Sequence, residues 1–444
     1  MSGYHEHAKT STPSLEIAKR IHLIDGNPEQ MGIFFEDLRD MLRDGLSSLC
    51  TAAGFAVLQT MMEADVTALA GPKGKHLPDR TAYRHGTERT SVVLGGQKVA
   101  VNRPRVRTCG DEGTELPIPT YEAVKQDDPL VEAALARMLH GLSSRDYRFG
   151  GDDPGAGCET KGTSKSSVSR RFIKATEAEL NRLLRREIGE LGIFVLLIDG
   201  VQFAKHNVIV CMGIDGEGRK HVLGLKIAAT ENARACKDLL RDLVERGLNA
   251  DNGLLAIIDG SKALKSALKA TFGDQVLIQR CQVHKLRNVT DYLPADQHPL
   301  VRRQMRKAWA LDHAEEALRS LRSLATRLEE NHPDAAASLR EGLEETVTVQ
   351  RLAISGLLRK TLSTTNAIES AFDIVRDRTR NVKHWQNGSM VKRWVGAGLL
   401  EAETRFRRIK GYRDMPMLRA EIRRLTVEKQ AKTSDEVAIG SKTA

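Results

Sequence analysis

The sequence predicts an α/β protein built around a mixed five-stranded sheet, with an all-α insertion in that core and helical regions before it. Three observations predict this class. Strand-like apolar runs alternate with helical patterns over residues 191–285, a long helical stretch follows over 286–360, and apolar positions recur at helical spacing over 30–70. At 444 residues the chain is too long for one compact core, so several domains are expected.

The segment 191–285 is the first part of the predicted core. "GIFVLLID" is predicted as a strand, "NVIVCMGID" and "KHVLGLKIA" as a hairpin, and "NARACKDLLRDLVERGL" as a helix. "GLLAIID", "SKALKSALKATF" and "QVLIQRC" continue as strand, helix and strand. The order β-β-β-α-β-α-β is the layout of a ribonuclease H-like core. The sequence has no glycine-rich dinucleotide fingerprint or P-loop, which argues against dehydrogenases and P-loop enzymes.

Changes in composition delimit the other regions. We expect an N-terminal helical region over 1–75, a β-hairpin region with a basic exit strand over 76–125 and a helix-turn-helix-like region over 126–190. The core's first part at 191–285 is followed by the all-α insertion at 286–360. Residues 361–425 return to the core and add a basic C-terminal region, and residues 426–444 are expected to be disordered.

The formal charge of +10 and the pI of about 9.3 favour an anionic partner, most often nucleic acid, although a merely basic protein has the same composition. The six cysteines have no framework spacing, which indicates a reduced, cytoplasmic protein. No signal peptide is recognisable, and no apolar run approaches the roughly 18 residues that a membrane span needs.

Two N-terminal segments carry basic residues that suit phosphates. In "TSVVLGGQKVAVNRPRVR" a hairpin turn is predicted at Gly95-Gly96, and Arg103 and Arg105 alternate on the exit strand, where they are predicted either to bind phosphate or to form a solvated face. A helix capped by Ser164 or Ser166 follows the loop at 150–162. Its exposed side suits either a recognition helix in the major groove or an ordinary basic surface, and it carries Ser167, Arg170, Arg171 and Lys174.

Two Ile-Asp-Gly units place Asp199 and Asp259 at the ends of strands that are neighbours in the predicted sheet. Each unit alone is also a common strand-ending turn. Two adjacent carboxylates repel one another, and a divalent cation between them offsets that cost. Mg²⁺ accepts such carboxylates together with water and phosphate oxygens, so the pair is a candidate phosphoryl-transfer site.

Glu369 in "NAIESAF" is the best third acid. Ile368, Phe372 and Val375 form the apolar stripe of its helix, and Glu369 lies on an adjoining face with Asp373, Arg376 and Arg380. The alternative is a capping box, in which Asn366 caps the helix and Glu369 only closes its first turn.

"CQVH" places Cys281 and His284 at metal-ligand spacing just after the last core strand. They are predicted as half of a structural zinc site, as support for the acids, or as plain packing. Further along, two tryptophans lie among basic residues. They suit either a nucleic-acid channel, in which a ring stacks on a base, or a core beneath a solvated basic face. The residues concerned are Arg376, Arg380, Lys383, Trp385, Arg393 and Trp394.

The ordered set "YRHGTERTSVVLGGQKVAVNRPRVR", "LLIDGVQ", "LLAIIDGSKAL", "QRCQVHKLRNV", "STTNAIESAFDIVRDRTRNVKHW" and "VKRWVGAGL" resembles the Mutator-like superfamily of DDE transposases, in its bacterial insertion-sequence branch. The resemblance covers about residues 30–425. It implies a catalytic triad on Asp199, Asp259 and Glu369 and the family's Cys-x-x-His pattern on Cys281 and His284. The long loop at 150–162 departs from the shorter connection usual in the family.

The resemblance implies an enzyme that binds terminal inverted repeats of double-stranded DNA and carries out hydrolysis and strand transfer with Mg²⁺, for which Mn²⁺ can substitute. Because two ends must be joined, a homodimer or larger assembly is expected. A catalytically silent regulator derived from a transposase and a metal-dependent nuclease without strand transfer are the alternatives.

Overall fold

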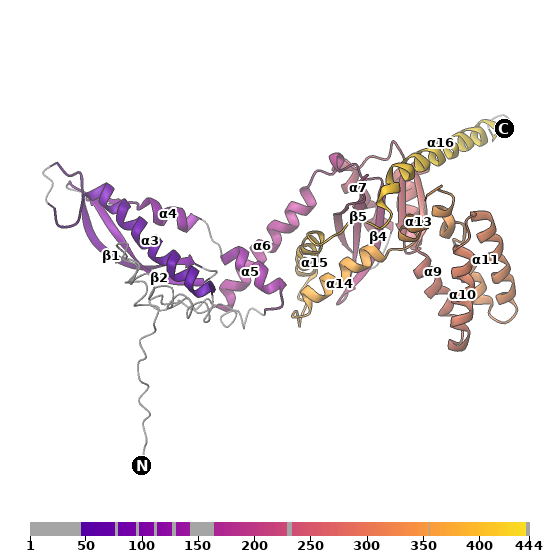
Figure 1. Cartoon of the computed structure of the whole chain (residues 1–444), viewed down its shortest axis with the longest axis horizontal. Helices are drawn as coiled ribbons and strands as arrows, with labels where there is room; N and C mark the ends of the chain where they lie inside the picture. Colours follow the sequence, from indigo (N-terminus) through magenta and orange to yellow (C-terminus); the bar gives the residue numbers. More distant parts are fainter. Residues whose placement is uncertain are drawn as a thin grey trace, which may run out of the picture. The chain divides into compact units, whose positions relative to one another are not determined.

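The structure, a computed structural model, describes residues 46–75, 79–94, 97–110, 113–126, 130–142, 164–228, 233–354 and 356–440. The chain forms two compact units, residues 1–175 and 176–444 (Figure 1). The boundary falls inside the region 126–190, whose last residues, among them Leu180 and Leu183, are buried in the core of the second unit. None of the described helices is both long enough and apolar enough to cross a membrane.

The first unit contains a long helix packed on a β-hairpin. Its elements are α3 (Leu46–Ala70), β1 (Ala82–Leu94), β2 (Gln97–Thr108), β3 (Glu115–Leu116), α4 (Pro119–Gln126) and α5 (Leu130–Leu139). β1 and β2 pair antiparallel, which confirms the hairpin. Leu58, Met62 and Val66 recur every fourth residue of α3, so they line one helix face and pack on the sheet. The turn at Gly95-Gly96 lies outside the described residues.

The region predicted as helix-turn-helix contains α5 and α6 (Lys165–Arg185). The residues between them, 143–163, are outside the described part of the chain, and they include the loop predicted at 150–162. Ser164 is the cap of α6, because its Oγ accepts a hydrogen bond from Ser167 N at 3.2 Å. The helix-turn-helix arrangement itself stays a prediction.

The second unit is a mixed α/β fold around a five-stranded sheet. Its first elements are β4 (Val195–Phe203), β5 (His206–Ile214), β6 (Lys220–Ala228), α7 (Ala233–Glu245), β7 (Leu254–Ile258), α8 (Lys262–Phe272) and β8 (Val276–Arg280). The sheet order is β6-β5-β4-β7-β8, with β4, β5 and β6 antiparallel and β4, β7 and β8 parallel. The predicted element order, and the adjacency of the first and fourth strands, are confirmed.

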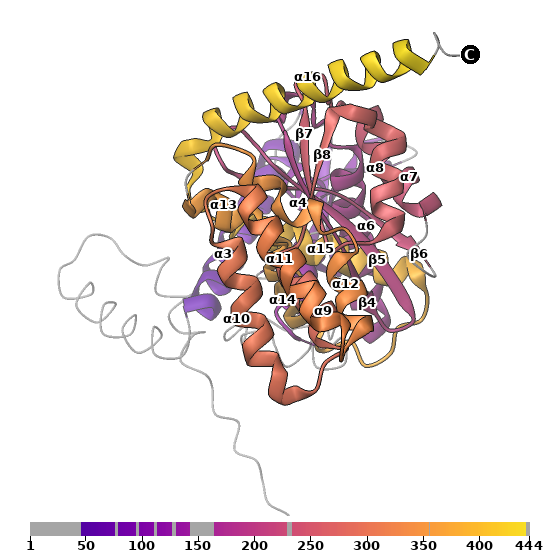
Figure 2. The ribbon, with the colours of Figure 1, turned by 90° about the vertical axis from the view of Figure 1, so that its right-hand side faces the viewer.

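Helices cover both faces of this sheet. A Cβ on Gly224 of β6 would meet Leu239 and Leu243 of α7, whereas Leu225 lies beside Gly396 of α15 (Gly388–Glu403). Because successive strand residues point to opposite faces, α7 and α15 lie on opposite sides. α7 packs beside α8 (Figure 2). All five residues of β7 are buried, as expected of a parallel strand covered on both faces.

The all-α insertion follows β8 directly and has an apolar core of its own. It consists of α9 (Gln282–Thr290), α10 (His298–Trp309), α11 (Ala314–Glu329) and α12 (Pro333–Arg340). The next helix, α13 (Gly356–Leu362), buries Leu358 and Leu362 in the core of the sheet instead. The helical character predicted for 286–360 is confirmed, and the first helix begins four residues earlier, at Gln282.

Three helices complete the described chain, namely α14 (Asn366–Thr379), α15 and α16 (Met415–Gly440). The prediction of a disordered tail over 426–444 is wrong for residues 426–440, which continue α16. The helix is attached to the core there, because Thr426 is buried and Lys429 Nζ lies 3.2 Å from Asp274 Oδ1. Residues 441–444 are outside the described part.

Candidate active site

Asp199 and Asp259 lie on adjacent strands at matching positions. Ile198 of β4 is in register with Ile258 of β7, and each aspartate is the next residue. Asp199 does not end its strand, contrary to the prediction, because β4 continues to Phe203 as half of a long hairpin with β5. Only β7 ends there. Asp259 forms a turn in which its Oδ1 accepts a hydrogen bond from Ser261 N at 2.9 Å.

The Asp199 carboxyl is buried, with 5% of the residue exposed, and its Oδ1 accepts a hydrogen bond from Gly200 N at 2.8 Å. Burial raises its pKa to about 7, and the negative charges of Asp259 and Glu369 act in the same direction, against the opposing effect of His284. The carboxylates of Asp259 and Glu369 are therefore close enough to act on the ionisation of Asp199. A carboxylate in this position keeps its charge at neutral pH most readily beside a cation.

Glu369 reaches the site from the first turn of α14. Ile368, Phe372 and Val375 of that helix are buried, as the predicted stripe requires, and Glu369 is half-buried beside them. The alternative capping box on Asn366 does not form. The cap residue is Thr365, whose hydroxyl donates to Glu369 Oε1 at 2.9 Å.

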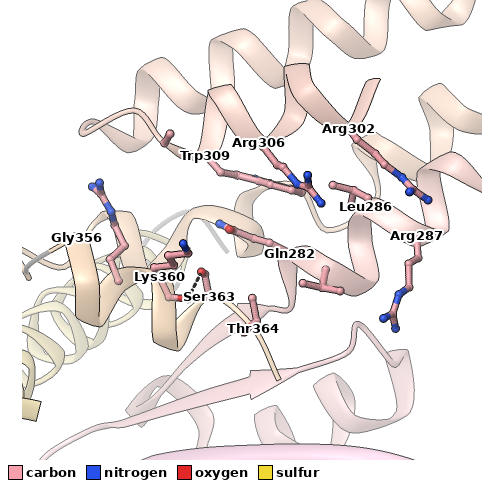
Figure 3. A pocket seen from close by; sticks show the side chains of 13 residues that line it. Gln282, Leu286, Arg287, Arg302, Arg306, Trp309, Gly356, Lys360, Ser363 and Thr364 are labelled. Carbon is pink, nitrogen blue, oxygen red and sulfur yellow. Dashed lines mark hydrogen bonds between the residues drawn. The ribbon is translucent and has the colours of Figure 1, made fainter. Parts of the chain in front are cut away.

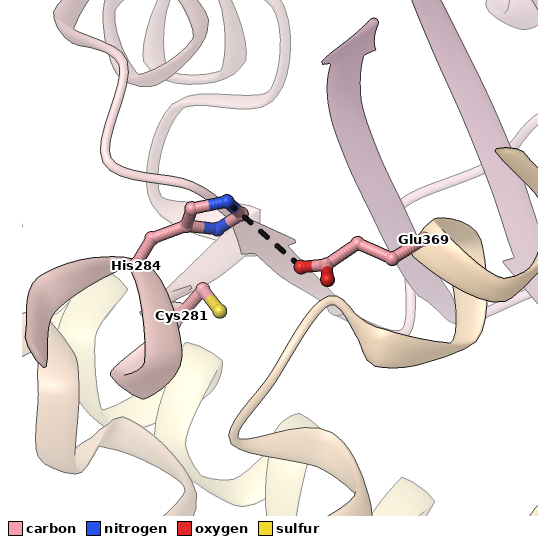
Figure 4. Close-up of side chains that lie close together, drawn as sticks. All are labelled: Cys281, His284 and Glu369. Carbon is pink, nitrogen blue, oxygen red and sulfur yellow. Dashed lines mark ion pairs between the residues drawn. The ribbon is translucent and has the colours of Figure 1, made fainter. Parts of the chain in front are cut away.

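Cys281 and His284 adjoin the acids through the backbone. Cys281 follows β8. Its backbone N donates to the carbonyl O of Ile258, the residue before Asp259, at 2.7 Å. His284, one turn later on α9, places Nε2 3.8 Å from Glu369 Oε1 (Figure 4). The interpretation of this pair as support for the acids agrees with these contacts.

Thr365 connects the whole cluster, although it is not among the residues predicted from the sequence. Its buried hydroxyl lies 3.4 Å from Cys281 Sγ and 3.3 Å from His284 Nδ1, in addition to its contact with Glu369. Thr365 N also donates to Cys281 Sγ at 3.4 Å. The available signal was a hydroxyl residue immediately before a helix that begins with a candidate catalytic acid.

The surroundings of His284 favour its protonated, positive form, and those of Cys281 favour its deprotonated, negative form. The hydrogen bond to Cys281 raises the pKa of His284 to about 9, helped by the nearby Asp199 and Glu369 and opposed by burial. Burial raises the pKa of the Cys281 thiol, but hydrogen bonds from His284 and Thr365 outweigh that effect and lower it overall. The potential ligand atoms of Cys281, His284 and Glu369 lie within 4.8 Å of one another, a trio that does not include Asp199 or Asp259.

The predicted basic contacts near α14 differ in exposure. Arg376 and Arg380 are exposed and pair with the acids of their own helix, Arg376 with Asp373 at 2.9 Å, and Lys383 is exposed as well. Arg393 is half-buried, with its Nη1 3.5 Å from Glu177 Oε1. The exposed residues are accessible to a phosphate backbone, and Arg393 is committed to a protein contact.

The two tryptophans lie against the core. Trp394 is 4% exposed, so the prediction that its ring stacks on a base is wrong, because α15 turns this residue inward. Trp385 is half-buried and meets Phe203 edge to face, with ring centroids 5.9 Å apart. For Trp394 the alternative of a core residue below a basic face is the observed one.

In the first unit, Arg103 and Arg105 are held by carboxylates. Arg103 pairs with Glu88 and Glu115, both at 2.7 Å, and Arg105 pairs with Glu115. These pairs neutralise the face that was predicted either to bind phosphate or to be solvated. On α6, Arg170 and Lys174 are exposed, and Arg171 contacts the Ser167 hydroxyl.

Comparison with known proteins identifies the family. The family model "Transposase, Mutator family" matches residues 34–408. The chain is 27% identical over 374 residues to the transposase for insertion sequence element ISRM5 of Rhizobium meliloti (strain 1021), covering 82% of this chain and 90% of that protein. It is 30% identical to the transposase for IS406 of Burkholderia multivorans (strain ATCC 17616 / 249) and 26% identical to that for IS256 in transposon Tn4001 of Staphylococcus aureus, each over 73% of this chain and 82% of the relative. The chain belongs to the Mutator family of transposases.

Proposed function

We propose that this chain is the transposase of a bacterial insertion sequence, and that Asp199, Asp259 and Glu369 are its catalytic acids. The observation that carries the proposal is the convergence of these carboxylates at one edge of the sheet, where their charges act on the ionisation of Asp199. DNA binding alone does not require a buried carboxylate beside two others.

The donor set fits Mg²⁺, with Mn²⁺ as a substitute, because hard divalent cations prefer carboxylate oxygens. Asp199 and Asp259 would hold the ion, and Glu369 would complete the site. When bound, the ion would supply charge neutralisation at the phosphate and a more acidic attacking water or 3′-hydroxyl.

The other residues of the chain position these acids. β4 and β7 fix Asp199 and Asp259 through their shared register. Thr365 orients Glu369 by hydrogen bonding, and His284 places positive charge beside it. Such contacts to a ligating carboxylate set its direction and its basicity.

Two groups of residues would hold the DNA. The exposed Arg376, Arg380 and Lys383 extend from the end of the helix that carries Glu369 and suit phosphate contacts. The α6 residues Ser167, Arg170, Arg171 and Lys174 would bind the terminal inverted repeats. Since two ends must be brought together, we propose that the active form is a dimer or a larger assembly.

The test is a strand-transfer assay with labelled DNA that carries the terminal repeats flanking the coding sequence, a target plasmid and Mg²⁺. We expect Asp259→Asn and Glu369→Gln to abolish joined products while DNA binding persists. The matched controls, exposed Asp251→Asn and Asp373→Asn, should retain joining. Joining that survives both Asp199→Asn and Asp259→Asn would overturn the assigned acids.

The same assay separates the alternatives. Cleavage without joining by the wild-type protein indicates a nuclease. Repeat binding without either reaction indicates a regulator derived from a transposase.

A further inference from the structure

A basic cavity of about 810 Å³ lies where α9 and α10 of the insertion meet α13. Figure 3 shows Arg302 and Arg306 of α10 on one wall, with Arg287 of α9 and Lys360 of α13 facing the same space. Arg359 is the fifth cation of the lining, which includes no aspartate or glutamate. The cavity therefore concentrates positive charge without an internal counter-charge.

Most of these cations have no acidic partner. Within the described part of the chain, Arg287, Arg306 and Lys360 form no ion pair, and Arg302 contacts only the Thr290 hydroxyl, at 3.5 Å, and leaves its buried Nε without a hydrogen-bond partner. Arg359 pairs with exposed Asp312 at 3.3 Å. Three other arginines of this region have glutamate partners, in the pairs Arg322–Glu344, Arg340–Glu329 and Arg351–Glu344.

The positive surface is elongated. A second cavity, of about 590 Å³, shares Arg302 and Arg306 and adds Arg303 and His298 along α10. We call this surface the α10 trough, defined by Arg287, Arg302, Arg303, Arg306, Arg359 and Lys360. A row of cations over two adjoining cavities suits a linear polyanion better than a single small anion, since several phosphates can be contacted in succession.

The trough shares its walls with the segments that hold the active-site cluster. Gln282 and Val283 line it, and they lie between Cys281 and His284 in the chain. Ser363 and Thr364 line it as well, directly before Thr365. Gln282 N donates to Ser363 O at 2.9 Å, which ties the two segments together.

We propose that the α10 trough binds the phosphodiester backbone of the DNA strand that enters the acid site. The inference rests on the proposed function and adds a binding surface to it. Guanidinium groups suit this role because they form paired hydrogen bonds with phosphate oxygens and are always charged. Val283 and Leu286 add apolar contact area for sugars, so the contact is independent of base sequence.

The experiment compares two single substitutions on one helix. Arg306→Ala removes a trough cation, whereas Lys307→Ala removes an equal charge from the neighbouring position, which lines a separate cavity against α11. Binding of a labelled short duplex and of a single strand of equal length is measured by fluorescence anisotropy across a salt series. Thermal unfolding of both variants checks that the fold is intact.

We expect Arg306→Ala to weaken DNA binding and to reduce the slope of log affinity against log salt by about 0.9 on duplex or about 0.7 on a single strand, the value for one lost phosphate contact. Lys307→Ala should keep the wild-type slope. Equal slopes for the two variants would overturn the trough. Inorganic pyrophosphate that protects the wild type but not Arg306→Ala against heat, without competing with DNA, would also overturn it, in favour of a small-anion site.

The strand-transfer assay, with Asp259→Asn as its inactive control, separates this inference from the proposed function. If the wild type joins DNA and the Arg306→Ala slope is unchanged, the trough is wrong and the transposase stands. If no protein joins or cleaves DNA but the slope falls as expected, the trough stands as a DNA site and the proposed chemistry fails.

Discussion

Thr365 shows how one hydroxyl organises several groups of different chemistry. It lies between a thiol, an imidazole and a carboxylate, and it is buried, so water cannot replace its hydrogen bonds. Its backbone position as the cap of α14 fixes the hydroxyl beside the Glu369 side chain of the same first turn. The orientation of Glu369 therefore depends on the residue that caps its own helix.

Thr365→Val keeps the shape of the side chain and removes the hydroxyl. We expect strand transfer to fall about tenfold to a hundredfold, as for other groups that orient a ligating side chain. Thr365→Ser should restore most of the activity, because it retains the oxygen. A Ser variant as impaired as the Val variant would show that packing of the methyl group, not the hydrogen bond, is what matters.

Asp215 is a second residue with a structural role, because its ionised carboxylate accepts the hydrogen bonds of a turn. It is buried at the turn between β5 and β6, where its carboxylate accepts hydrogen bonds from Glu217 N, Arg219 N, Arg219 Nε and His221 Nε2 at 2.8–3.0 Å. Burial raises its pKa, but the donors from His221 and Arg219 outweigh burial and lower the pKa below the usual 3.8.

Because the pKa of Asp215 is lower in the folded than in the unfolded state, its charge stabilises the fold at pH values above the unfolded-state pKa. This stabilisation is lost as the pH falls through the folded-state pKa. We expect Asp215→Asn to lower the free energy of unfolding by about 1–3 kcal/mol at neutral pH. The gap to wild type should narrow as the pH falls below about 4. Urea unfolding over a pH series measures both effects, with exposed Asp251→Asn as control, and a gap independent of pH would contradict the assignment.

At the scale of elements, α16 is held to the core by close packing on a glycine. Gly253, just before β7, has φ +83°, and a Cβ there would lie 2.8 Å from Ile422 Cγ2 and 2.9 Å from Thr426 Oγ1 of α16. The left-handed backbone and the close approach of the helix both require the absence of a side chain.

Gly253→Ala should therefore separate α16 from the sheet and cost about 1–3 kcal/mol. Hydrogen exchange should quicken in residues 415–429 and stay unchanged in β5. Gly216→Ala is the matched control, because a Cβ at Gly216 meets nothing within 4 Å. Unchanged exchange in α16 would show that the helix accommodates the methyl group.

The elements of the core were predictable because their signals are local. Apolar runs such as Leu254–Ile258 are buried on both faces, and their order along the chain fixes which strands can be neighbours. The continuation of β4 beyond Asp199 was not predictable, since it depends on pairing with β5. The helix over 426–440 was missed for a similar reason, because its anchor, Lys429 with Asp274, joins residues far apart in sequence.

The candidate site likewise combines residues that local sequence patterns place with residues that depend on contacts between distant segments. The adjacency of Asp199 and Asp259 follows from strand order. Periodicity only placed Glu369 beside the apolar stripe of its helix, and its role was implied by the family resemblance. Thr365 and the α10 trough depend on how α9, α10 and α13 meet, which no local pattern encodes. Trp394 was misjudged because basic neighbours in sequence do not reveal which way a helix faces.

At the scale of the whole molecule, the site lowers the stability of the fold that holds it. Asp199 is buried beside two other acids, a cost that a divalent cation would offset.

In the presence of a chelator that removes divalent cations, we expect Asp199→Asn to melt at a higher temperature than wild type. Mg²⁺ at about a hundred times its dissociation constant should then stabilise wild type by about 2.7 kcal/mol and leave the variant unchanged. Thermal unfolding with and without Mg²⁺ measures both; an equal response of the two proteins would remove Asp199 from the metal site.

The hydrogen bond between Gln282 N and Ser363 O has an evolutionary consequence. It joins the first residue of α9 to the residue that follows α13, so the chain between β8 and α14 begins and ends at one place beside β8. Closing a longer or shorter excursion between such fixed points changes the loop entropy only slowly with length. Descendants of this protein can therefore enlarge, trim or exchange this excursion, and with it the proposed α10 trough, while the acids keep their spacing.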